Sequence, residues 1–218
     1  MKKDRLDIIY EDKYIIIVNK PYHLLTIGND KEKENTLYHK ISLYLKRKNK
    51  NNKVFIVHRL DYDTSGVIIF AKDSKIKTIL QDNWNKVIRK YMAIVNGKME
   101  KDEETLKSYL KETKTNLVYS TNSKLGKLAI TKYKTVLRTD KYSLLDISIE
   151  TGRKNQIRVQ LSDINHSIVG DKKYGTKDNS KRMYLCAYYL KFNHPVTKKE
   201  LEFELDVPKD FLEIINKK

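Results

Sequence analysis

The sequence has 218 residues, of which 39% are hydrophobic, and this suits one globular unit or two lobes that share a core. Lysine and arginine outnumber aspartate and glutamate by 45 to 28, and the net charge of +17 favours nucleic acid over a membrane surface or a mere bias of composition. A single cysteine excludes an intramolecular disulfide framework, and no apolar run approaches the roughly 20 residues of a membrane span, so we expect a cytoplasmic protein.

The first predicted elements are a β-hairpin and a helix. Residues 8–12 and 14–18 are rich in isoleucine and tyrosine, and Pro21 stops the second strand. Lys20, beside this proline, either lines a site or is solvated.

A helix is predicted to begin at an N-cap at Asn35 and to run through Arg47, because apolar residues recur there at helical spacing. The basic tract of residues 46–53 follows. It is either a mobile loop or a contact for RNA.

A polar corner lies between the apolar runs 54–57 and 67–71, which predict strands. The corner runs from His58 to Gly66 and holds more chemistry than a plain turn needs. Three interpretations of Asp61 and Asp63 are open: a divalent-ion site, a solvated turn, or one carboxylate that acts as nucleophile or base. In the third case a nearby arginine would keep the carboxylate ionised, since burial alone would neutralise it.

Beyond the corner, Ser74 is the expected cap of a helix that reaches Ile88 and holds Trp84 in the core. Residues 89–95 predict a strand. The segment 101–107 is charged, and we expect it to be exposed.

The second half of the chain predicts further strands and two more polar clusters. One cluster runs from Thr151 to Arg158 and leads through a glycine into a helix, and the other is the loop Gly170 to Gly175. The remaining predicted strands cover 117–119, 129–137, 142–150, 184–192 and 201–207, and residues 211–215 predict a short helix.

Most of these elements are strands, with three or four helices among them, and the strands follow one another without regular helical crossovers. We therefore predict an α+β fold with a mainly antiparallel, mixed central sheet flanked by helices and loops. No glycine-rich phosphate loop and no close Cys and His pair occurs, so we expect no cofactor and no metal.

The polar corner resembles the signature of the RluA-type pseudouridine synthases, His58-Arg59-Leu60-Asp61-x-x-Thr64-Ser65-Gly66. Other segments resemble the remaining family motifs, in family order. They are Ile9 to Pro21, Lys90-Tyr91-x-Ala93-x-Val95-x-Gly97, Thr151-Gly152-Arg153-x-x-Gln156-Ile157-Arg158-Val159 with Gly170-Asp171-x-x-Tyr174-Gly175, and Leu190-x-Phe192-x-His194-Pro195. The resemblance implies the pseudouridine synthase catalytic fold, with residues 1–218 as a single catalytic domain of two lobes that share one sheet.

The resemblance also implies an RNA pseudouridine synthase that isomerises specific uridines of rRNA, tRNA or both. The target base would leave its stem-loop and enter the site. Asp61 is the implied catalytic carboxylate, Tyr91 stacks on the base, and Arg158 pairs with Asp61 and keeps it ionised. Asp63 falls at a variable position of the signature.

RNA is the implied partner, no membrane contact is expected, and we expect a monomer. Arg59 is placed to fill the space that the flipped base leaves. The other expected contacts with substrate or RNA are His58, Thr64, Arg153 and Lys20, and Thr64 also helps to hold the shape of the corner.

The chain departs from the family pattern at four positions. His23 stands where a glycine is usual, and Asn155, Gln160 and Cys186 stand at common histidine positions. These departures bear on substrate preference and not on the implied catalytic residues. We also expect that the small RNA-binding domain that many members carry in front is missing, so that target capture rests on the basic surface of the catalytic domain.

Two other hypotheses stay open. A non-catalytic RNA-binding or ribosome-assembly factor would keep the same fold. A metal-dependent transferase would use Asp61 and Asp63.

Overall fold

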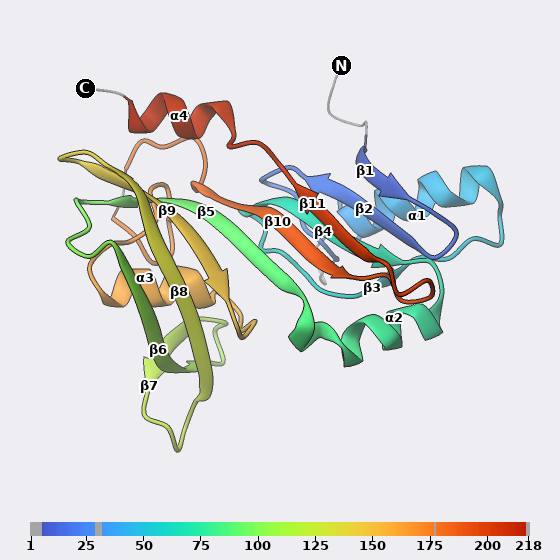
Figure 1. Cartoon of the computed structure of the whole chain (residues 1–218), viewed down its shortest axis with the longest axis horizontal. Helices are drawn as coiled ribbons and strands as arrows, with labels where there is room; N and C mark the ends of the chain where they lie inside the picture. The colour runs from blue at the N-terminus through green and yellow to red at the C-terminus, as the bar shows by residue number, and fades with distance from the viewer. Residues whose placement is uncertain (1–5, 29–31, 177, 217–218) are drawn as a thin grey trace. The chain divides into compact units, whose positions relative to one another are not determined.

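In the computed structural model the chain forms two compact units (Figure 1). The first comprises Met1–Ile88 and Tyr189–Leu205, and the second comprises Arg89–Tyr188 and Asp206–Lys218. The structure describes residues 6–28, 32–176 and 178–216. Within these ranges it contains eleven strands and four α-helices, none of the helices long and apolar enough to cross a membrane.

The first unit is built on an antiparallel arrangement of β1 (Asp7–Glu11), β2 (Ile15–Lys20) and β4 (Ser65–Ala71), in that order. The short β3 (Phe55–Ile56) pairs with β4, and β11 (Glu200–Glu204) pairs with β10 (Leu185–Asn193). The turn between β1 and β2 is closed by Asp12, whose carboxylate accepts the backbone N–H groups of Tyr14 and Ile15 at 2.7 and 2.8 Å. The predicted hairpin is confirmed.

Two helices cover opposite faces of these strands. Successive strand residues point to opposite faces, and Ile17 and Ile69 join one cluster with Ile76 of α2 (Ser74–Asp82). Glu11, the cross-strand partner of Ile16, points to the other face. There its carboxylate is bound by side chains of α1 (Leu37–Lys48).

Both predicted N-caps of the first unit were wrong by one residue. Thr36 caps α1, since its hydroxyl accepts the N–H of His39 at 3.1 Å. Asp73 caps α2 by accepting the N–H of Lys75 at 2.7 Å. The predicted extension of this helix to Ile88 was also wrong.

The end of α2 has a local cause. The side chain of Asn83 donates to the carbonyl of Ile79 at 2.9 Å and competes with the helical hydrogen bonds. A 3-10 turn follows at Trp84–Lys86, and Ile88 already begins a strand. Trp84 is partly buried against the cluster of α2, as expected for a core residue.

The second unit orders its strands as β5 (Ile88–Asn96), β9 (Tyr142–Ile149), β8 (Lys127–Arg138), β6 (Glu103–Glu112) and β7 (Val118–Thr121), with antiparallel pairing throughout. The helix α3 (Gln156–Asp163) packs on one face through Ile157 and Leu161. The C-terminal α4 (Lys209–Ile215) buries Phe211 and Ile215.

The prediction missed strand β6, which begins inside the charged segment 101–107. Leu106 and Leu110 are buried, whereas Lys107 is exposed. Charged residues on the outer face masked this alternation in the sequence. The α+β class with mainly antiparallel pairing is confirmed.

Candidate active site

The polar corner of the first unit is fixed by backbone hydrogen bonds on both sides of Asp61. Before it, the N–H and carbonyl of Leu60 both bind the hydroxyl of Thr26, at 3.2 and 2.8 Å. After it, the N–H of Thr64 donates to the carbonyl of Asp61 at 3.2 Å and closes a turn. The side chain of Thr64 is buried. The corner is therefore a rigid turn that presents the partly exposed Asp61.

The side chain of Lys20 contacts the backbone of this corner. Its side chain is fully buried, and its ammonium donates to the carbonyls of Leu24 at 2.7 Å, Pro21 at 3.1 Å and Tyr62 at 3.4 Å. A buried cation needs such partners. Since Tyr62 directly follows Asp61, the geometry favours a positioning role for Lys20 over the direct RNA contact expected from the sequence.

The second aspartate of the corner, Asp63, lies beside His23. Asp63 lies 3.5 Å from Nε2 of His23, whose ring stacks on Tyr62 at 5.5 Å between centroids. His23 takes a left-handed conformation with φ of 57°. This explains why a glycine suits the position in the family pattern. Within the described ranges, no three His, Cys, Asp or Glu side chains gather in a way that could hold a metal ion.

The other two candidate contacts of the corner differ in exposure. Arg59 is exposed to solvent. His58 accepts the N–H of Ile69 through Nε2 at 3.3 Å, and its ring lies 4.5 Å from that of Trp84. These contacts tie His58 to the scaffold, whereas Arg59 is accessible to a partner.

In the second unit, Arg158 is held by a bidentate ion pair. Its Nε and Nη2 donate to the two carboxylate oxygens of Asp171, both at 2.7 Å, and both side chains are buried. Burial alone would raise the pKa of Asp171, but hydrogen bonding and charge from Arg158 outweigh it and lower the pKa, with help from the N–H groups of Lys173 and Tyr174. The guanidinium also lies over the ring of Tyr174, at 5.1 Å.

The start of α3 is shaped by Asn155, which has a left-handed φ of 53°. Its side-chain amide donates to the hydroxyl of Tyr174 at 2.9 Å, which also accepts the N–H of Val118 at 3.0 Å. Asparagine tolerates this conformation better than most residues. The departure from histidine at this position therefore fits the local backbone.

Arg153 lies just before α3 and is exposed. Its Nε donates to the carbonyl of Leu128 at 2.9 Å, and its backbone N–H donates to the side chain of Gln156 at 3.0 Å. Arg153 therefore keeps an exposed guanidinium at a defined place beside the helix start.

Tyr91 lies on β5, where it pairs with Ile147 and packs against the cluster that also contains Ile157 of α3. Strand β5 and the helix that carries Arg158 therefore share one core. The side chain of Tyr91 is only partly buried.

Sequence reasoning missed two polar residues near these candidates. Asp171 stood in the third polar loop, yet its pairing with Arg158 joins a helix to a loop 13 residues away. Arg89, two residues before Tyr91, is buried, and this burial lowers the pKa of its guanidinium while the charge of Tyr91 opposes the change. Gly152 leaves room for this side chain, since a Cβ there would lie 3.0 Å from Nη1 of Arg89.

The candidates thus divide between the two units. The first unit carries Lys20, His58, Arg59, Asp61 and Thr64, and the second carries Tyr91, Arg153 and Arg158. The pairing of Arg158 with Asp61, which the resemblance implies, stays a prediction.

Known proteins resemble this chain along most of its length. A family model described as RNA pseudouridylate synthase matches residues 14–163. The Bacillus subtilis protein YhcT, named as an RNA pseudouridine synthase, is 33% identical over 210 residues, which are 94% of this chain and 70% of that protein. Ribosomal large subunit pseudouridine synthase D of Buchnera aphidicola subsp. Baizongia pistaciae is 35% identical over 231 residues, which are 96% and 71% of the two proteins.

A solved structure shares the fold. The structure of human RNA pseudouridylate synthase domain containing 4 matches with a TM-score of 0.79 at 23% identity, over 94% of this chain and 90% of that chain. The resemblance to RluA-type enzymes and the pseudouridine synthase catalytic fold are confirmed. This chain belongs to the RNA pseudouridylate synthase family.

Proposed function

We propose that this RNA pseudouridine synthase modifies uridines of large-subunit rRNA and that Asp61 is its catalytic carboxylate. The observation that carries the proposal is the turn around Asp61, which is fixed on both sides within the segment that the family model matches. The rRNA assignment is supported by relatives that are named as large-subunit enzymes and are 30–35% identical to this chain. tRNA stays a second substrate to test.

The proposed reaction is an isomerisation and needs no added group. The bond between C1′ of the ribose and N1 of uracil breaks, the uracil turns in the site, and a bond forms between C1′ and C5. The proton on C5 leaves and N1 gains one, so atoms balance. Asp61 would initiate the cleavage, as attacking group or as base.

We assign Tyr91 and Arg158 to the same reaction. Tyr91 would stack on the uracil and assist the removal of the C5 proton, which suits its partly buried ring. Arg158 would serve as a fixed cation. The lowered pKa of Asp171 supports this, because an ionised partner keeps the guanidinium in one orientation.

We further propose that residues 1–218 act as one catalytic domain, as a monomer in the cytoplasm. Exposed Arg59 would contact the RNA beside the flipped base, and Arg153 would contact the backbone. Thr64, His58 and Lys20 would act through the shape of the corner, since their side chains are buried or bound to the scaffold.

The test compares Asp61→Asn with Asp63→Asn. Pseudouridine is mapped on in vitro transcribed large-subunit rRNA, on tRNA and on ribosomal particles after incubation with each variant. We expect Asp61→Asn to abolish turnover and to keep RNA affinity, and Asp63→Asn to keep both. Full activity of Asp61→Asn would refute its assignment, and absence of pseudouridine from every RNA with the unaltered protein would refute the function.

A deletion strain separates the alternative. If Asp61→Asn rescues growth as well as the unaltered gene does, a non-catalytic role in RNA binding or ribosome assembly is favoured. A comparison of pseudouridine maps from the deletion strain and its parent identifies the target uridine.

A further inference from the structure

The end of α1 carries a dense group of cations, which we name the α1 basic cluster. All of its side chains are exposed. Its members are Lys46, Arg47, Lys48, Lys50 and Lys53. No aspartate or glutamate occurs between Asn35 and Leu60, so the neighbouring sequence does not compensate this charge.

The backbone that presents the cluster is ordered by hydrogen bonds. The N–H of Asn49 donates to the carbonyl of Leu45 at 3.1 Å, and the side chain of Asn52 donates to the same carbonyl at 2.9 Å. The N–H of Asn51 binds the side chain of Asn49 at 2.9 Å. These hydrogen bonds hold the tract against the end of the helix. The tract therefore differs from a mobile loop, which was one of the two interpretations of the sequence.

Stabilisation of the helix accounts for only some of the cations in this cluster. Cations in the last turn favour the helix dipole, which accounts for Lys46, Arg47 and Lys48. Lys50 and Lys53 lie beyond the helix. Within the cluster, all of whose members the structure describes, Lys48 alone forms an ion pair, with Glu11 at 2.9 Å.

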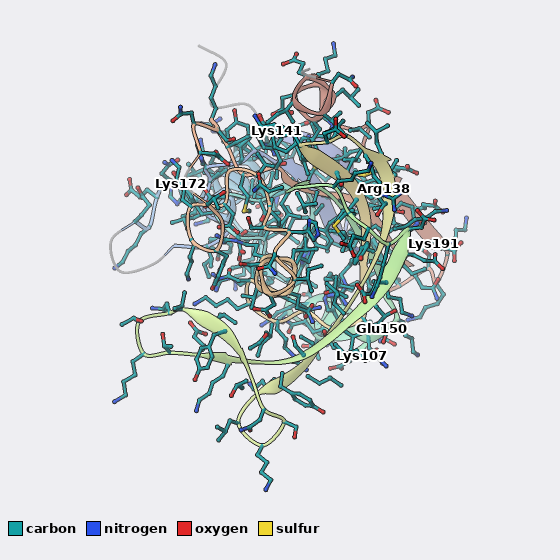
Figure 2. The ribbon with its side chains drawn as sticks, turned by 90° about the vertical axis from the view of Figure 1, so that its left-hand side faces the viewer. Lys107, Arg138, Lys141, Glu150, Lys172 and Lys191 are labelled. Atoms are coloured by element: carbon teal, nitrogen blue, oxygen red, sulfur yellow. The ribbon has the colours of Figure 1, made fainter. Side chains whose placement is uncertain are left out.

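Cations of the second unit are distributed differently. Figure 2 shows Lys107, Lys141 and Lys172 on separate segments of that unit. Several others are paired with acids. These pairs are Lys101 with Glu104, Lys132 with Glu150, Arg138 with Asp102, and Lys154 with Glu112. The α1 basic cluster is therefore a patch of the first unit where positive charge is concentrated and little compensated by acids.

The opposite end of α1 adjoins the catalytic corner. The N–H of Leu37 donates to the carbonyl of Leu25 at 2.8 Å, and the hydroxyl of the next residue, Thr26, binds Leu60 of the corner. At about 1.5 Å per residue, the 12 residues of α1 span about 18 Å, and the cluster lies at the end of the helix that is farther from the corner. The corner and the cluster lie in the same unit.

We propose that the α1 basic cluster binds the phosphate backbone of the substrate RNA, several nucleotides from the target uridine. This inference rests on the proposed function and adds a second RNA contact to it. Concentrated exposed charge attracts a polyanion and gives sequence-independent affinity. A membrane surface does not fit, because Leu37, Ile41 and Leu45 of α1 are buried in the core, and the exposed Leu43 alone is not an apolar face that could enter lipid.

The test removes four charges and keeps Lys48, which is bound to Glu11. The variant combines Lys46→Gln, Arg47→Gln, Lys50→Gln and Lys53→Gln. The matched control combines Lys13→Gln, Lys75→Gln, Lys86→Gln and Lys199→Gln, four exposed cations of the same unit outside α1. Both variants are first checked for unaltered thermal unfolding.

Affinity is then measured at several salt concentrations for a large-subunit rRNA transcript and for RNA hairpins of graded length. We expect the cluster variant to bind the transcript about tenfold more weakly or worse, and its slope of log K against log salt to fall by about 2–4. A hairpin must therefore span about 18 Å to reach both the corner and the cluster. Hairpins shorter than this should therefore bind equally to all three proteins, and the loss should appear only with longer ones.

Pseudouridine formation is a separate readout. At saturating RNA the single-turnover rate of the cluster variant should equal that of the unaltered protein, since the corner is unchanged. If the unaltered protein binds RNA but forms no pseudouridine, the proposed function fails. The salt dependence of binding then still tests whether the α1 basic cluster contacts RNA. The proposed RNA contact of the α1 basic cluster is refuted if the cluster variant binds RNA as tightly as the control variant does. Binding to phosphatidylserine vesicles is measured in parallel, and a loss of vesicle binding without a loss of RNA binding would also refute it.

Discussion

Arg158 and Asp171 meet in a bidentate geometry, with both nitrogen to oxygen distances at 2.7 Å and both side chains buried. Asp171 also accepts the N–H groups of Lys173 and Tyr174, at 2.9 and 3.1 Å. The loop that carries Asp171 is thereby wrapped around its own carboxylate. Arg158 thus has its orientation set by a loop that sequence reasoning placed in the same family motif without pairing the two residues.

Replacement of Asp171 should impair both stability and catalysis. Asp171→Asn leaves Arg158 as a buried cation without its counter-charge, and we expect a loss of about 3 kcal/mol in the free energy of unfolding. Misplacement of Arg158 should lower kcat by about 10–100-fold with little change in KM. The measurements are denaturant unfolding, and single-turnover rates well below the unfolding temperature.

Asp163→Asn is the control, because Asp163 lies on the same helix and is exposed, and an asparagine oxygen can still accept the hydrogen bond from the hydroxyl of Ser120. It should change neither quantity. If Asp171→Asn lost stability but kept kcat, the pair would be structural only, and the proposed role of Arg158 in the reaction would lose its support.

The buried ammonium of Lys20 makes a second prediction. Lys20→Met keeps the length of the side chain but removes the donor from the carbonyls of Leu24, Pro21 and Tyr62. At about 1 kcal/mol per lost hydrogen bond, we expect the free energy of unfolding to fall by about 2–3 kcal/mol. The rate should fall as well, because the corner beside Asp61 loosens.

Replacement of the exposed Arg59 should affect RNA binding and not stability, unlike replacement of Lys20. Arg59→Gln should leave thermal unfolding unchanged and reduce the salt slope of RNA binding by about 1, because one cation that lies against the RNA beside the flipped base is removed. Lys20→Met should leave that slope unchanged. A reduced slope with unchanged unfolding for Lys20→Met would restore the RNA contact that the sequence predicted for Lys20.

The local elements were predictable where alternation or spacing is visible. The hairpin from Asp7 to Lys20 follows from its β-branched runs and its closing Asp12. Both caps were misassigned because two good capping residues stand side by side, Asn35 with Thr36 and Asp73 with Ser74. Only the backbone geometry decides between such neighbours.

The site was predictable from motif resemblance, but not its supporting contacts. The donation of Lys20 to Tyr62 spans 42 residues, and the pair of Arg158 and Asp171 joins a helix to a loop. Periodicity carries no information on such contacts, because they depend on how distant segments pack. The burial of Lys20 likewise depends on the tertiary fold, since an isolated lysine is normally solvated.

The left-handed backbone at His23 gives a fourth prediction. His23→Gly removes the strain of a φ of 57° but also removes the ring that stacks on Tyr62, so we expect a net change within about 1 kcal/mol. His23→Val should destabilise by more than about 1 kcal/mol, since a β-branched side chain fits this conformation poorly. Denaturant unfolding measures both.

Tyr22→Val serves as the control for His23→Val, because Tyr22 is also exposed and is not among the residues with positive φ. A smaller loss for His23→Val than for Tyr22→Val would show that the backbone at His23 relaxes at little cost.

The carboxylate of Glu11 makes the stability of the first unit depend on pH. It accepts hydrogen bonds from Tyr44 and Lys72 at 2.7 Å and from Lys48 at 2.9 Å. Burial alone would raise its pKa, but these bonds outweigh burial and lower the pKa to about 2 from the ordinary 4.5. The unfolded chain therefore binds more protons between these two values, so stability falls as the pH is lowered through this window.

Glu11→Gln should therefore cost about 2 kcal/mol near neutral pH, where the stabilisation from the ionised carboxylate is fully present. As the pH falls below about 4.5 the unaltered protein should lose this advantage, and the two unfolding free energies should converge towards about pH 2. Urea unfolding across this range measures the difference, and Glu213→Gln, an exposed glutamate of the second unit, is the control. A difference that stayed constant with pH would mean that Glu11 acts through packing and hydrogen bonding, and not through its charge.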